Sequence, residues 1–215
     1  MPTPDSRVAF VSGERLPGWV ERFAASHGSV AAEEVDGGLQ LSAADGAVAL
    51  LQPPWPADGR PGSGRDAVAR MASLAAQSRT LGLVLVRRGG YSVAVVRDGA
   101  ALAAKTGTRH IPSRTAAGGW SQQRFARRRA NQADALVEAV AEHAVRIFSE
   151  HRIEYLVPGG DRALAEQVLG EPALKRYAAL TRLPFLDVPD PRAPVLKRAA
   201  ADACSVRIVV TDPPA

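Results

Sequence analysis

The residues best suited to chemistry form one short stretch, Gly118-Gly119-Trp120-Ser121-Gln122-Gln123. Its two glycines permit positive φ angles and a close approach of the backbone to a ligand. Ser121 can cap a helix, which leaves the next backbone N–H groups available to an anion. A glutamine side chain is no base at neutral pH, but it can orient a water molecule and donate N–H bonds to an oxyanion. On composition alone, a plain flexible loop with a serine cap remains the simpler interpretation.

Positive charge is concentrated around this stretch. No acidic residue occurs between Asp98 and Asp134, and the window carries +7 against +5 for the whole chain, so the remainder nets −2. The basic residues of the window are Lys105, Arg109, Arg114, Arg124, Arg127, Arg128 and Arg129. Like charges at helical spacing repel one another, and positive charge near a helix N-terminus opposes the helix dipole. We therefore expect an anionic partner, namely RNA, with Trp120 either stacking on a base or anchoring the loop.

The composition excludes several other classes of protein. With 46% apolar and 23% charged residues in 215, the chain is an ordinary globular protein. Its single cysteine, Cys204, excludes an internal disulfide and a cysteine-rich zinc site, and we expect it to be buried. We expect neither a cofactor nor a metal. The N-terminus does not resemble a signal peptide and the apolar runs are too short to span a membrane, which predicts a cytoplasmic protein.

The first 64 residues are predicted to form a small α+β portion. A helix is expected from Arg15 to His27, followed by three short strands at 29–35, 39–42 and 48–51. Residues 52–64 contain four prolines and three glycines, which indicates a loop or linker. We therefore expect domains at 1–64 and 65–215, with the glycine–glutamine loop at 109–123.

The second domain is predicted to be a ribonuclease-H-like α/β fold. A helix capped by Asp66 precedes three antiparallel strands, which form a meander, and a long helix from Ser121 to Glu150 then follows the loop. After that helix we expect a strand at 153–158, a helix capped by Asp161, a second helix at 172–180, a short strand at 185–188, a helix at 194–203 and a closing strand at 205–211. This order predicts a mixed sheet with flanking helices.

A family resemblance extends this reading. Gly118 to Arg129, with Arg114 before it and Asn131-Gln132 after it, resembles the actinobacterial branch of the Vms-like release factor family. The opening Arg15-Leu16-Pro17-Gly18-Trp19 and the segment from Phe23 to Gly28 also look like this branch, so the resemblance covers most of the chain. The family is similar to the catalytic middle domain of eukaryotic and archaeal class 1 release factors, whose Gly-Gly-Gln loop enters the peptidyl transferase centre.

The resemblance implies a peptidyl-tRNA hydrolase that frees stalled nascent chains from large ribosomal subunits. The family's Gly-x-x-Gln pattern falls on Gly119, Trp120, Ser121 and Gln122, which assigns the catalytic role to Gln122. Relative to Gly-Gly-Gln, the two inserted residues shift the reach of the loop by roughly 7 Å if extended, so the adjacent Gln123 stays open as the active residue. The implied partners are peptidyl-tRNA and the rRNA of the large subunit.

Two other functions compete with hydrolysis. The basic helix would serve equally well in a non-catalytic RNA- or ribosome-binding module. A nuclease acting on the tRNA end is a third alternative, but it would need clustered carboxylates on the first strands of the sheet, and residues 81–97 contain none. The sequence leaves the oligomeric state open.

Overall fold

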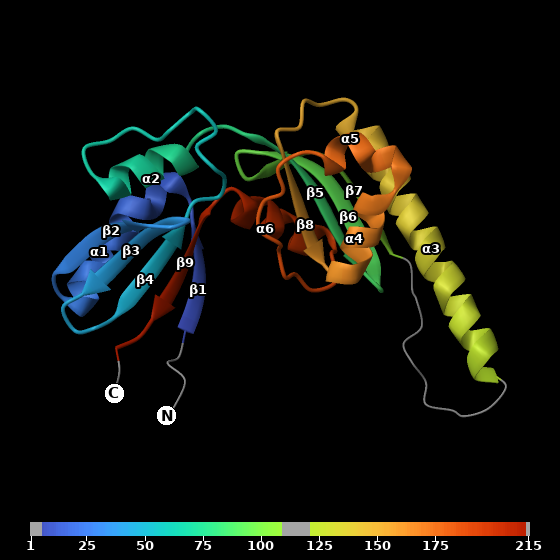
Figure 1. Cartoon of the computed structure of the whole chain (residues 1–215), viewed down its shortest axis with the longest axis horizontal. Helices are drawn as coiled ribbons and strands as arrows, with labels where there is room; N and C mark the ends of the chain where they lie inside the picture. Colours follow the sequence, from blue (N-terminus) through green and yellow to red (C-terminus); the bar gives the residue numbers. More distant parts are fainter. Residues whose placement is uncertain (1–5, 109–120, 214–215) are drawn as a thin grey trace. The chain divides into compact units, whose positions relative to one another are not determined.

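The protein folds into two compact units. The computed structural model describes residues 6–108 and 121–213, and for residues 121–132 it describes the backbone alone. Unit 1 comprises residues 1–78 and 201–215, and unit 2 comprises residues 79–200. Figure 1 shows the elements of both units in sequence colours. Each unit has a sheet and a hydrophobic core of its own.

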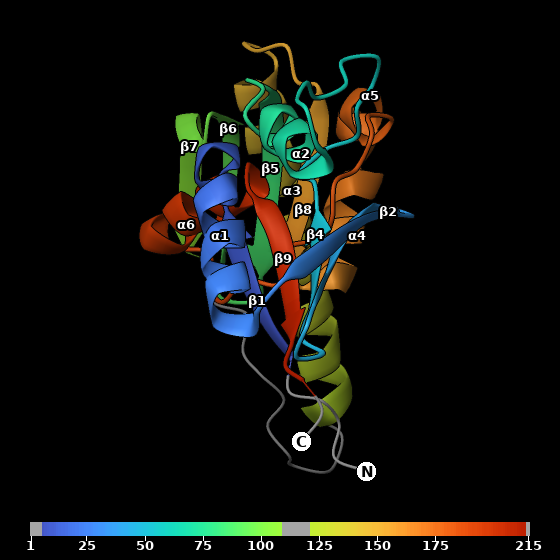
Figure 2. The same ribbon diagram turned by 90° about the vertical axis from the view of Figure 1, so that its left-hand side faces the viewer.

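Unit 1 is an antiparallel five-stranded sheet with two helices on one face (Figure 2). Its strands, in spatial order, are β1 (Ser6–Val11), β9 (Val206–Thr211), β4 (Val48–Gln52), β3 (Gly38–Ala43) and β2 (Val30–Val35). The covering elements are a 3₁₀ turn η1 (Gly13–Arg15), α1 (Leu16–His27) and α2 (Ala67–Ala75). Alternate residues of β3, β4 and β9 are buried beneath Leu16 and Phe23 of α1 and Met71 of α2. The predicted first helix and the three strands after it are confirmed.

Unit 1 extends beyond the expected boundary at residue 64. The proline- and glycine-rich segment packs against α2, because the buried Trp55 donates its indole N–H to the Leu74 carbonyl and Ser63 N–H donates to the Ser73 hydroxyl. A Cβ atom at Gly62 would lie only 1.8 Å from the Arg70 carbonyl oxygen. Proline and glycine therefore mark irregular but packed backbone here, and the unit continues through α2 to Ser78.

The C-terminal strand also lies in a different place from the one expected. β9 was expected to close the sheet of the second domain, but it pairs with both β1 and β4 in the middle of the unit 1 sheet. Its buried residues Val206, Ile208 and Val210 alternate, as in a strand with one buried face. Alternation identifies a strand but not its partner. In the structure, the chain returns to unit 1 for its last strand.

Unit 2 contains a four-stranded mixed sheet. In spatial order its strands are β7 (Ala100–Thr108), β6 (Gly90–Arg97), β5 (Thr80–Arg87) and β8 (Tyr155–Gly160). The first three form the predicted antiparallel meander, and β8 lies parallel to β5. This order confirms the ribonuclease-H-like mixed sheet. The predicted strand at 185–188 is reduced to a single bridge between Gly159 and Leu186.

Helices pack on this sheet largely as the sequence predicts. They are α3 (Ser121–Phe148), α4 (Arg162–Gly170), a 3₁₀ turn η2 (Pro172–Leu174), α5 (Lys175–Ala178) and α6 (Ala193–Ala203). The apolar stripe of α3 from Leu136 to Phe148 is buried in the same core as β6, β8 and α4. The helix expected at 172–180 is divided into η2 and α5. Cys204, expected to be buried, is only half-buried.

Replacement of Phe148 by alanine is expected to destabilise unit 2 strongly. The ring is fully buried, meets Tyr177 edge-on at 5.2 Å, and lies against Gly82, where a Cβ atom would come within 2.9 Å of it. Such a tightly enclosed ring leaves a cavity on truncation, so we expect Phe148→Ala to lower the free energy of unfolding by about 3–5 kcal/mol. Chemical denaturation measures this loss. The half-buried Val145→Ala on the same helix is the control, and an equal loss in both variants would contradict the packing described.

Candidate active site

The predicted catalytic stretch lies between the end of β7 and the beginning of α3. β7 ends at Thr108, which pairs with Gly90, and α3 begins at Ser121. Five of the predicted site residues lie outside the described residues, namely Arg109, Arg114, Gly118, Gly119 and Trp120. The others belong to α3, where the backbone alone is described: Ser121, Gln122, Gln123, Arg124, Arg127, Arg128 and Arg129.

Both candidate glutamines belong to the first turn of α3, immediately after Ser121. The first four N–H groups of a helix have no acceptor within the helix, and the helix dipole makes this end positive. The end of α3 therefore offers backbone donors to an anion or a developing oxyanion. Consecutive positions lie about 100° apart around a helix axis, so the backbone places Gln122 and Gln123 on different sides of this turn.

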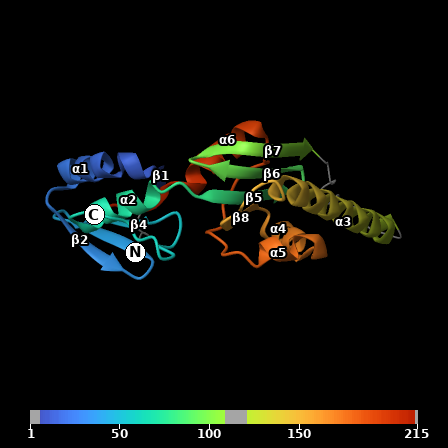
Figure 3. The same cartoon turned by 90° about the horizontal axis from the view of Figure 1, so that it is seen from above.

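The first part of α3 extends beyond the sheet, as Figures 1 and 3 show. Among the described side chains of α3, Leu136 is the first that is fully buried. Residues 121–132, for which the backbone alone is described, correspond to roughly 18 Å of helix axis. Four arginine positions, 124 and 127–129, fall in this projecting part. The helix thus carries the glutamines and the arginines out from a folded core.

Several elements end at the same end of the sheet, which we call the loop end. The strand pairings place the end of β5 at Arg87, the start of β6 at Gly90, the end of β7 at Thr108 and the end of β8 at Gly160 side by side. α4 begins here as well, because Asp161 follows β8 and caps the helix through the Leu164 N–H. Ligands of open α/β sheets bind at the carboxyl ends of parallel strands. The predicted loop therefore begins beside a place where this fold commonly carries ligands.

The loop end contributes a cation that sequence reasoning missed. The β5–β6 turn carries Arg87 and Arg88, next to the pair Gly90 and Thr108. Arg87 is held by Asp187 at 2.8 Å and by the Val188 carbonyl. Arg88 is exposed, and its guanidinium has no hydrogen-bond partner among the described residues. The sequence signal is the Arg87-Arg88 pair before Gly89-Gly90, between the first two strands of the predicted meander.

The carboxylates near the loop end each have a different neighbour. Asp161 caps α4, Asp187 pairs with Arg87, and Asp190 lies against Gly89 of the β5–β6 turn. Among the described residues, no three histidine, cysteine or carboxylate side chains are grouped in a way that could hold a metal ion. Gly160, the last residue of β8, has a φ of +93° and its Cα hydrogen faces the Val86 carbonyl, so the strand ends here and Asp161 begins the cap of α4.

An aromatic contact fixes the base of the loop. The ring of Tyr91 covers Gly107, where a Cβ atom would lie 2.5 Å from the ring, and it stacks on His143 of α3 at 5.7 Å. Gly107 is the next-to-last residue of β7, so this contact joins the strand before the loop to the helix after it. The His143 ring also lies 3.3 Å from the Arg146 guanidinium.

This contact predicts a pH-dependent stability. Burial lowers the pKa of His143 from its ordinary value near 6.5, and the charges of Arg146 and Lys105 lower it further, against a weaker opposing effect of Glu142. Below pH 6.5, His143 is therefore protonated more readily in the unfolded chain than in the folded protein. The free energy of unfolding falls as the pH drops through this window. We expect His143→Gln to flatten the fall of the thermal midpoint below pH 6.5. His151→Gln is the control, and an unchanged slope in His143→Gln would contradict this prediction.

Unit 2 is thus an α/β unit with a mixed sheet, in which the long helix α3 follows the predicted catalytic stretch. The family model described as "Actinobacteria/chloroflexi VLRF1 release factor" matches residues 79–209, which is more than half of the chain. The chain belongs to this family and has a release-factor-like role in translation. No curated protein matches the chain. No helix among the described residues is long and apolar enough to cross a membrane.

Proposed function

We propose that the protein is a peptidyl-tRNA hydrolase that releases stalled nascent peptides from tRNA on the large ribosomal subunit. The observation that carries this proposal is the place of Gln122, in the first turn of a helix that extends beyond the core of a release-factor family member. The matched segment, residues 79–209, includes the whole loop and all of α3.

In the proposed reaction, Gln122 positions a water molecule against the ester that joins the peptide to the 3′-terminal ribose. The water oxygen forms a bond to the carbonyl carbon, and loop and helix N–H groups stabilise the resulting oxyanion. The bond between that carbon and the ribose oxygen then breaks, and the proton from water is passed to the ribose oxygen. The products are a peptide with a free carboxyl group and a tRNA with a free terminal hydroxyl.

The charge distribution supports an RNA substrate. Unit 2 contains 20 basic and 11 acidic residues, a net charge of +9, whereas unit 1 contains 7 basic and 11 acidic residues, a net charge of −4. We assign phosphate contacts to the arginines at 109, 114, 124 and 127–129, and we add Arg88 at the loop end. Phosphate contacts fix position without reading sequence, as a factor acting on any stalled peptide requires.

The test uses wild-type protein and purified large subunits that carry a labelled peptidyl-tRNA. We expect the label to leave the subunit as free peptide while the tRNA stays at full length. Binding to the subunit without release would instead support the second candidate, a non-catalytic RNA-binding module, which the basic projecting part of α3 alone would satisfy.

A further inference from the structure

The outer edge of β2 in unit 1 is open to a further strand. β2 is a regular six-residue strand that pairs with β3 on one side and ends the sheet on the other. Edge strands of soluble proteins are usually protected by charged side chains, proline or a bulge. Val30–Val35 contains no proline and its register with β3 is regular, and its only charges, Glu33 and Glu34, repel an acidic strand but not a basic one. Its free backbone groups therefore suit the addition of an extended peptide.

An apolar groove of about 350 Å³ lies beside this edge, on the helix-covered face. Val30 and Ala32 of β2 form one wall, Val20 and Ala24 of α1 the other, and Leu41 and Val68 also line it. Because alternate residues of an added strand would face the same side as Val30 and Ala32, its side chains would enter the groove. A groove of this size accepts one or two aliphatic side chains.

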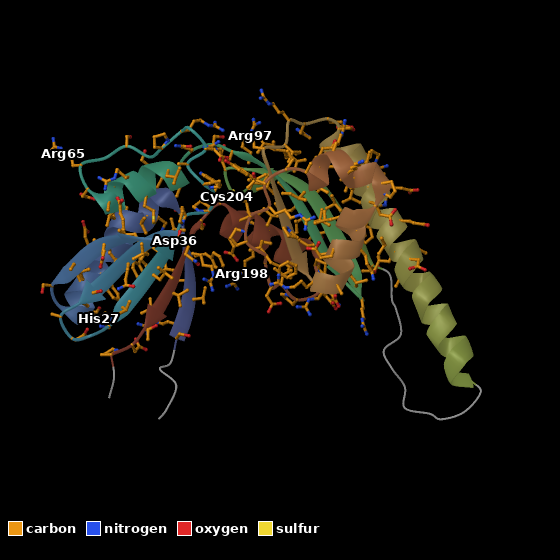
Figure 4. All side chains as sticks on the ribbon, viewed as in Figure 1. His27, Asp36, Arg65, Arg97, Arg198 and Cys204 are labelled. Carbon is orange, nitrogen blue, oxygen red and sulfur yellow. The ribbon has the colours of Figure 1, made fainter. Side chains whose placement is uncertain are left out.

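The rim of the groove and the end of the strand are acidic. Glu21 and Asp66 line the groove. Glu33 lies on the opposite face of β2, because it alternates with Ala32 and Glu34, and Asp36 follows in the turn (Figure 4 labels Asp36). Glu34 is paired with Arg70 at 2.6 Å, whereas the carboxylates of Glu21, Glu33 and Asp36 pair with no cation among the described residues. The opposite edge strand, β1, borders a smaller hollow of about 220 Å³ rimmed by Arg7 and Arg22. Charge therefore distinguishes the two edges.

We propose that β2 binds an extended basic peptide as a sixth strand, with its aliphatic side chains in the groove and its lysines or arginines on the opposite face of the sheet, beside Glu33. A nucleic acid is disfavoured here by the net charge of −4 on unit 1. Proteins of RNA-rich particles carry basic arms. The inference rests on the proposed function only in placing this partner on the ribosome. There, unit 1 would bind the partner while unit 2 acts.

The test is fluorescence anisotropy with the full-length protein and a labelled eight-residue peptide of alternating lysine and valine. We expect Glu33→Lys, which reverses the charge on the face shared by the lysines, and Ala32→Trp, which fills the groove, each to weaken binding about tenfold. Glu14→Lys, the same charge change on an exposed residue outside the groove, is the matched control. A peptide with glutamate for lysine and one with a central proline are expected not to bind.

Equal binding by wild type, Glu33→Lys and Ala32→Trp would overturn the proposal, as would tight binding of the proline peptide, because proline cannot pair along the strand. If single-stranded RNA binds both wild type and Glu33→Lys more tightly than the basic peptide does, the proposal is also overturned and the occupant is a nucleic acid. Thermal midpoints show that each variant is folded. Peptide release is not measured in this assay, so its outcome is independent of the proposed hydrolysis.

Discussion

Replacement of Gln122 by alanine is expected to lower the rate of peptide release by about 10²–10³-fold, the usual effect of removing one group that orients water or stabilises an oxyanion. Binding to the large subunit should be unchanged, because alanine is a good helix former and the phosphate contacts come from other residues. The measurement is single-turnover release of labelled peptide at saturating protein, which separates the chemical step from binding.

Gln123→Ala is the matched control, since it removes the same side chain one position further along the first turn of α3. We expect it to retain most of the activity. If Gln123→Ala loses release and Gln122→Ala keeps it, the active glutamine is Gln123 and the loop reaches its target in a different register. Equal activity of both variants and wild type would contradict a catalytic glutamine.

Replacement of Arg127, Arg128 and Arg129 by glutamine is expected to weaken binding to the large subunit by about 10–100-fold at low salt. Each lost phosphate contact reduces the number of counterions that binding releases. The slope of log affinity against log salt should therefore decrease by about 2 when all three contacts are lost. Binding titrations at several salt concentrations measure both quantities. Release at saturating protein should recover most of its wild-type rate.

A control must remove the same charge elsewhere on unit 2. Arg152, Lys175 and Lys197 are exposed, and their side chains have no hydrogen-bond or ion-pair partner among the described residues, so their replacement by glutamine changes the net charge equally. We expect a much smaller change in the salt slope from this variant. Similar slopes in both triple variants would mean that net charge alone, and not the projecting part of α3, determines binding.

The sequence predicted the local elements well because their signals are local. The spacing of apolar residues in α3 identified the buried stripe from Leu136 to Phe148, and Asp66 and Asp161 marked two helix starts that the structure confirms. Strand alternation identified β9 but could not identify its partners β1 and β4, which lie more than 150 residues earlier. The pairing of distant strands depends on the whole sheet, and no short pattern records it.

The candidate site was predictable in its chemistry but not in its surroundings. The glycines, glutamines and arginines were evident from residue type and spacing. The contact of Tyr91 with Gly107 and His143 joins three distant segments, and Arg88 reaches the loop end only through the pairing of Gly90 with Thr108. The acidic groove beside β2 likewise combines residues from two helices and two strands. Such sites become visible only after folding.

The most direct test of the proposed hydrolysis follows the oxygen atom of the attacking water. The reaction is run with wild-type protein and peptidyl-tRNA on large subunits in ¹⁸O-labelled water, and both products are weighed by mass spectrometry. Hydrolysis of the ester predicts a single ¹⁸O in the carboxyl group of the released peptide and an unlabelled, full-length tRNA. Release of the peptide on a shortened tRNA fragment, with ¹⁸O in a terminal phosphate, would contradict hydrolysis and identify a nuclease.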